Sequence, residues 1–182
     1  MKKPLLFALC SVFVASSASA ELPRAPQPIK PLPIKPMPPL RLPKPPVRQC
    51  VDPAATAIDA AIVARTSRFA GTVRITGRVK NVGNAAYVSR PGQQIVQMWE
   101  ETPGARPRLV AQQAFTNLAV GQEMFVSFAR PWSSSDEFQP QYKVVITYDP
   151  DIFLDGNTKN DDCNMNNNAR VRAPASINAL FR

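Results

Sequence analysis

The chain has 182 residues, of which 45% are hydrophobic and 19% charged, with 20 prolines, three cysteines and a formal net charge of +9. This length suits one globular domain, because a proline-rich first third can add little to a core. Histidine is absent. Its absence excludes histidine-containing zinc sites and the Ser–His or Cys–His pairs of nucleophilic enzymes.

Residues 1–20 have the three parts of a secretory signal peptide. Lys2 and Lys3 form a basic start, residues 5–15 form an apolar run, and small residues at 16–20 allow cleavage after Ala20. A membrane-spanning helix needs about 20 apolar residues, roughly twice this run. We therefore expect export to the periplasm or to the cell surface and extracellular space, and Cys10 is expected to leave with the signal peptide.

Residues 21–49 are predicted to be a proline-rich basic linker. Proline at nearly every second or third position prevents helix and sheet, and favours an extended polyproline II spacer. The repeat of Pro-Ile-Lys-Pro at 28–31 and 33–36 also allows a second interpretation, a docking peptide for an aromatic groove. Six basic residues against Glu21 alone between positions 21 and 48 favour weak contact with an anionic membrane or wall surface. Nucleic acid is not an expected partner.

After cleavage two cysteines remain, Cys50 and Cys163. An even pair in an oxidising compartment predicts one structural disulfide.

From Cys50 onward, short β-rich runs separated by Gly, Pro, Asn and Asp predict an all-β sandwich of seven strands over residues 50–175, followed by a C-terminal tail at 176–182. The clearest strand alternates from Thr72 to Lys80 and ends at a turn, Asn81–Asn84, whose residue types tolerate positive φ. Further strands are expected at Gln94–Glu100, Pro107–Phe115, Glu123–Arg130, Gln141–Asp149 and Ala169–Ala173. Ile58–Ala64 is expected to be an edge strand, although its spacing also fits a short helix.

Large aromatic residues supply the core that two sheets need. We assign to it Trp99, Phe125, Phe128, Tyr142 and Tyr148. Trp99 is placed as a central core anchor, and Tyr142 as a tyrosine corner whose hydroxyl bonds to the backbone. Trp132, beside Pro131 and a serine run, is the aromatic residue predicted to make a surface contact.

The order of four short motifs resembles the immunoglobulin-like family called the cell-adhesion-related domain found in bacteria (CARDB). The motifs are the strand and turn at 71–84, the Leu-Ala-Val-Gly-Gln turn at 118–122, the Tyr-Lys-Val-Val-Ile strand within 142–150, and the Asn run at 166–168. The resemblance implies a seven-stranded immunoglobulin-like sandwich without catalysis, usually a module of surface or exported proteins. Val120 departs from the pattern, which often has proline there, and the stretch before the Asn run is longer and richer in Asp.

The segment 149–164 is rich in oxygen donors, which calcium prefers. With Asp151 at position 1 of a calcium loop, the ligands are Asp151, Asp155, Asn157 and Asp162, but Phe153 occupies position 3 and aspartate replaces the usual final glutamate. The other interpretation is a turn-rich hairpin, in which Asp and Asn serve turn geometry. Acid–base catalysis is not expected from an exposed Asn-rich loop.

These observations predict a non-catalytic, exported binding or adhesion module of the bacterial envelope or surface, with no catalytic residue and no cofactor other than calcium. Its partner is expected to be a protein or a cell-envelope polymer. Two alternatives stay open. One is an assembly component that docks through the proline-rich linker or an edge strand, and the other is a calcium-dependent module that binds carbohydrate or protein.

Overall fold

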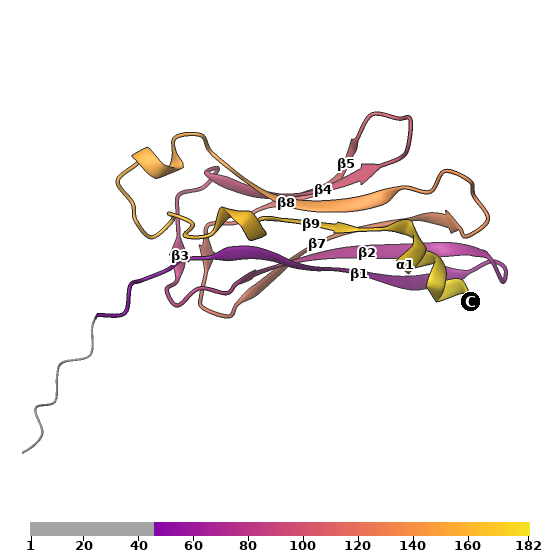
Figure 1. Ribbon diagram of the computed structural model, residues 1–182, viewed down its shortest axis with the longest axis horizontal. Helices are drawn as coiled ribbons and strands as arrows, with labels where there is room; N and C mark the ends of the chain where they lie inside the picture. Colours follow the sequence, from indigo (N-terminus) through magenta and orange to yellow (C-terminus); the bar gives the residue numbers. More distant parts are fainter. Residues whose placement is uncertain (1–45) are drawn as a thin grey trace, which may run out of the picture. The chain divides into compact units, whose positions relative to one another are not determined.

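The computed structural model describes residues 46–182 (Figure 1). The predicted signal peptide and the linker up to residue 45 lie outside the described residues. Residues 46–49 have no regular secondary structure. Within the described range, no helix is long and apolar enough to cross a membrane.

The described chain is all-β apart from one short helix and three 3₁₀ turns. A three-stranded antiparallel sheet has the order β1-β2-β7, with bounds β1 Pro53–Arg65, β2 Ala70–Asn81 and β7 Glu123–Ser133. A four-stranded sheet has the order β5-β4-β8-β9, with bounds β5 Arg108–Ala114, β4 Gln94–Glu101, β8 Gln141–Tyr148 and β9 Ala169–Arg172. Two short strands pair separately, β3 Tyr87–Val88 and β6 Asn117–Leu118. The 3₁₀ turns are Ile152–Leu154, Met165–Asn167 and Ala179–Phe181, and the helix α1 is Pro174–Asn178.

Each predicted strand segment overlaps a strand of the structure. The segment with two interpretations, Ile58–Ala64, lies within β1 at the edge of its sheet. The structure adds β3 and β6, which are two residues long and too short for a periodic signal.

The core lies between the two sheets, because each strand turns alternate residues inward. On β2, Val73, Ile75 and Val79 are 0%, 0% and 1% exposed, as the alternation predicts. At Gly77 a methyl group would overlap the side chain of Val144 on β8. The glycine therefore lets the two sheets approach closely at this point.

The aromatic assignments are correct for three residues and wrong for two. Tyr142 is fully buried, and Phe128 and Tyr148 pack partly buried against the core. Trp99 lies on the outer face of β4, because the inward positions of that strand are occupied by Gln94, Val96, Met98 and Glu100. Phe125 is 49% exposed on the outer face of β7.

The prediction that Trp132 makes a surface contact is wrong. β7 continues through Pro131 to Ser133, because proline is tolerated on an edge strand. Trp132 therefore points inward and is 4% exposed. Its indole N–H donates to Asn178 Oδ1 at 2.8 Å, and its ring packs near that of Tyr142.

Residues 176–182 are part of the domain and not a tail. Ile177 and Phe181 are 0% and 2% exposed and belong to the core. Arg65 on β1 donates to the carbonyl of Leu180 at 2.9 Å and lies over the Phe181 ring. The C-terminal turns thus close the end of the sandwich opposite β3 (Figure 1).

Candidate functional site

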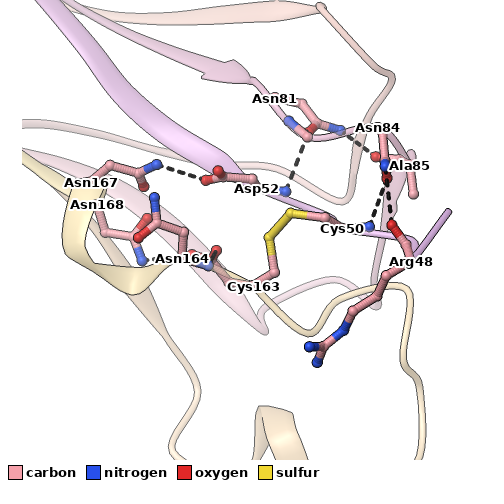
Figure 2. The surroundings of a disulfide bond; sticks show 12 residues. Arg48, Cys50, Asp52, Asn81, Asn84, Ala85, Cys163, Asn164, Asn167 and Asn168 are labelled. Carbon is pink, nitrogen blue, oxygen red and sulfur yellow. Dashed lines mark hydrogen bonds between the residues drawn. A yellow bond between two sulfur atoms is a disulfide. The ribbon is translucent and has the colours of Figure 1, made fainter.

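The predicted disulfide is confirmed. Cys50 and Cys163 are bonded across a sequence separation of 113 residues, with their Cα atoms 5.6 Å apart (Figure 2). The bond joins the residues just before β1 to the long loop that follows β8. Cys163 N–H also donates to the carbonyl of Val51 at 2.9 Å. The disulfide and this backbone hydrogen bond therefore fix residues 50 and 51, which directly follow the proline-rich linker, to this loop.

Asn81, at the end of β2, organises the backbone around the disulfide. Its Nδ2 donates to the carbonyls of Ala85 at 2.8 Å and Leu118 at 2.9 Å, while its Oδ1 accepts from Gly83 N–H at 3.0 Å. The side chain is 0% exposed, so these bonds satisfy a buried amide. Asn81 thus begins the turn after β2 and also bonds that turn to the backbone at Leu118.

Gly83 serves close approach instead of the positive φ that the turn sequence suggested. A methyl group at this position would overlap the carbonyl oxygen of Cys50. The positive-φ glycines of the described chain are elsewhere, at Gly92, Gly104, Gly121 and Gly156. The neighbouring Asn84 accepts from Cys50 N–H at 2.7 Å and donates to the carbonyl of Arg48 at 3.1 Å (Figure 2).

The loop after β8 is held by side chains that bond within it and to neighbouring strands. Asp155 accepts from Asn157 N–H at 2.7 Å, Asn160 Nδ2 at 2.8 Å and Gln93 Nε2 at 2.7 Å. These donors, the Asn157 N–H first, hold the pKa of Asp155 below its usual value. Asn157 Nδ2 in turn donates to the carbonyl of Val88 at 2.9 Å. The Asp and Asn residues thus build a defined loop conformation.

Asp162 anchors the other end of this loop. It is 7% exposed and accepts from Tyr148 Oη at 3.0 Å, Asn168 Nδ2 at 2.7 Å and Asn164 N–H at 2.9 Å. Burial, and then the adjacent Asp162 carboxylate, raise the pKa of Tyr148. The hydroxyl therefore stays protonated at neutral pH and donates to Asp162.

The structure does not gather the four residues predicted to bind calcium. Asp155 and Asn157 are neighbours, Asp162 is bonded elsewhere, and Asp151 is exposed. Within residues 46–182, the acidic and cysteine side chains whose ligand atoms lie within 4.8 Å of one another are Cys50, Asp52 and Cys163. Both sulfurs of that group are in the disulfide, and Asp52 accepts from Asn167 Nδ2 at 2.8 Å. Calcium binding stays a prediction that the geometry does not strengthen.

The loop displays two large apolar side chains, Phe153 and Leu154, and neither of them was predicted from the sequence to make a contact. Phe153 and Leu154, on the 3₁₀ turn Ile152–Leu154, are 45% and 82% exposed. Ile152, the first residue of that turn, is buried. Phe153 borders a groove of about 640 Å³. Its other walls come from residues 48–51, the turn before β3, β3 and the loop, and include Arg48, Val88, Lys159 and Asp161. Adjacent apolar residues inside an otherwise polar loop were the sequence signal for this site.

No family model matches the chain, and no curated protein matches it. Among solved structures, it is similar to the crystal structure of β-glucosidase from Kluyveromyces marxianus in complex with glucose, with 17% identity and a TM-score of 0.26. The match covers 53% of this chain and spans 13% of that protein. So low a TM-score supports no statement about fold or activity.

Proposed function

We propose that the protein is a non-catalytic, exported binding module of the bacterial envelope or cell surface. In this proposal an immunoglobulin-like sandwich of the CARDB type presents its disulfide end to a protein or an envelope polymer, and the proline-rich segment serves as a spacer. The observation that carries the proposal is the exposure of Phe153 and Leu154, 45% and 82%, on a loop of fixed conformation.

A fixed loop favours binding because its order is already present before the partner arrives. Side-chain and loop ordering on association costs free energy, and preorganisation reduces that cost. Here the three bonds to Asp155, the bonds to Asp162 and the disulfide hold the backbone. Exposed apolar groups rimmed by polar ones are typical of contact surfaces.

Two observations support export. The first is the Cys50–Cys163 disulfide, since such bonds persist in oxidising compartments. The second is the arrangement of basic, apolar and small residues at 1–20.

The alternative, an assembly component that pairs through a sheet edge, has one observation in its favour. The outer strand β5 carries its one charge, Arg108, at its first residue, and has neither charge nor proline from Leu109 to Ala114. The other edge strands carry such protection, with Asp59 on β1, Pro131 on β7 and Arg170 on β9. An edge of this kind can accept a partner strand.

The test measures binding of the labelled mature protein to intact cells and to purified cell-wall sacculi of the bacterium that encodes it. The double variant Phe153→Ser, Leu154→Ser is compared with Val63→Ser, Phe138→Ser, which removes two apolar residues of 51% and 62% exposure outside this loop. We expect the loop variant to bind at least tenfold more weakly, because central apolar anchors dominate interface energies, and the control to bind like the wild type.

Equal binding by both double variants would exclude the loop as the contact site. A third protein, with Ala111→Pro on β5, separates the alternative. If it loses binding while the loop variant keeps it, the partner pairs with the sheet edge.

A further inference from the structure

The outer face of the four-stranded sheet carries an aromatic side chain and aligned polar and apolar residues. Trp99 on β4 lies opposite Leu109 on β5 and Lys143 on β8, and Lys143 lies opposite Val171 on β9. The next outward row contains Gln112, Gln97, Val145 and Ala169. These rows form a surface across four strands, on the side of the sheet away from the core.

The indole of Trp99 is held at this surface. Its N–H donates to Gln97 Oε1 at 3.2 Å, and the same oxygen accepts from Thr147 Oγ1 at 3.3 Å. The ring borders a groove of about 490 Å³ lined by Trp99, Glu101, Arg106, Pro107, Lys143 and Val145. The groove therefore combines one aromatic wall, aliphatic surface, two cationic side chains and one carboxylate.

The cations of this groove differ from Arg78 and Lys80 of the opposite face, which are paired, whereas Arg74 on that face is exposed and has no ion pair within residues 46–182. On the β1-β2-β7 face, Arg78 pairs with Asp59 at 2.9 Å, and Lys80 lies 3.6 Å from Glu123. Neither Arg106 nor Lys143 has an ion-pair partner among residues 46–182. The carboxylate of Glu101 in the groove instead accepts from Gln141 Nε2 at 2.7 Å. Two cationic groups are thus free to meet an anion.

We propose that this face binds an acidic polysaccharide. A sugar ring stacks its C–H face on the indole of Trp99, and the carboxylate of a uronic acid pairs with Lys143 and Arg106. Gln97, which accepts from the Trp99 indole, and Gln112, which lies opposite Gln97 on β5, supply amide groups for sugar hydroxyls, in the way that ligand sites combine apolar area with a few polar groups. The basic proline-rich segment of another copy is a poorer occupant, because like charges disfavour its approach.

The groove at Trp99 is independent of the loop that carries Phe153, since its lining residues belong to β4, β8 and the turn between β4 and β5. Phe153→Ser, Leu154→Ser should therefore bind acidic polysaccharide like the wild type. This separates the failure of one proposal from the failure of the other.

The experiment titrates the mature protein with polygalacturonate, and with dextran as a neutral polysaccharide, by calorimetry and tryptophan fluorescence. Trp99 reports on the groove, whereas Trp132 is 4% exposed and should stay unaffected. Trp99→Ala should weaken polygalacturonate binding at least tenfold, and Arg106→Ala, Lys143→Ala severalfold with a smaller salt dependence. Dextran should not bind.

Matched controls come from the opposite face, where Phe125→Ala removes an aromatic residue that is 49% exposed and Arg74→Ala removes an exposed cation. Both should bind like the wild type, and thermal melts should show that every variant is folded. Wild-type affinity in Trp99→Ala, an equal loss in Arg74→Ala, or equal binding of dextran would each overturn the proposal.

Discussion

At one end of the sandwich, a disulfide and a set of Asp and Asn side chains hold β1, the turn after β2 and the loop after β8 together. At the opposite end, Ile177, Phe181 and Trp132 fill the space between the sheets, and residues 46–182 place no disulfide there. The first end is fixed by directional bonds that leave apolar groups outside. The second is closed by burial of apolar area, and its exposed apolar residues, Phe69 and Phe138, lie on two separate turns instead of one hydrogen-bonded loop.

The C-terminal end also holds a charged cluster. Glu100 is 6% exposed and accepts from Arg130 at 2.6 Å, Arg108 at 2.8 Å and Tyr142 at 2.9 Å. Burial alone would raise the pKa of Glu100, but the bonds from Arg108, Arg130 and Tyr142 outweigh it and lower the pKa. The hydroxyl of Tyr142 thus bonds to a carboxylate, and not to the backbone as a tyrosine corner would.

The largest expected effect comes from breaking the disulfide end. Cys50→Ser, Cys163→Ser should reduce the free energy of unfolding by about 4 to 5 kcal/mol, because the bond closes a loop of over a hundred residues in the unfolded chain. Urea unfolding of the oxidised wild type and the variant measures the difference. Hydrogen exchange should increase most within residues 149–168. Because the bond acts on the unfolded chain, amides that exchange by global unfolding should speed up everywhere. An equal increase around Phe181 in amides that exchange by local opening would contradict the independence of the two ends.

The next effect tests the apolar end. Phe181→Ala should cost about 3 kcal/mol, the lower part of the range for buried phenylalanine, because a chain terminus can relax into the space. Phe138→Ala, at a residue 62% exposed, is the control and should change stability by less than about 0.5 kcal/mol. If the two variants unfold at the same urea concentration, the C-terminal turns do not close the core.

The smallest effect concerns Glu100. Its lowered pKa means that ionised Glu100 stabilises the folded state above its unfolded pKa, about 4.3, and that this stabilisation is lost as pH falls through the folded pKa. Glu100→Gln should cost about 1 to 2 kcal/mol at pH 7 and less at pH 3. Urea unfolding at both pH values checks this, with the outward Glu101→Gln as control. A loss that does not change with pH would show that only packing matters.

The strand positions could be predicted because alternation is a local property of the sequence. β2 shows this best, with Val73, Ile75 and Val79 buried and Arg74 exposed. The disulfide could be predicted because two cysteines have only one pairing. The C-terminal turns could not, since a short segment after the last strand carries no periodic signal for burial.

The two tryptophans exchanged their predicted places for a physical reason. β4 has apolar residues in both alternating positions, Ile95 and Trp99 in one and Val96 and Met98 in the other. The second set faces inward although it includes Gln94 and Glu100. Their partners, Tyr87 at 3.0 Å and Arg130 at 2.6 Å, come from other strands, and no local pattern reveals them.

The disulfide has a mechanical consequence for a domain on a tether. A pull on residue 48 reaches Cys163, and so the loop that carries Phe153, through the side chains of one disulfide, whose Cα atoms are 5.6 Å apart. If the tether is anchored and a partner holds that loop, the tension runs along this short path. The hydrogen-bond ladders of both sheets then lie outside the line of force, and the domain would bear load without unfolding.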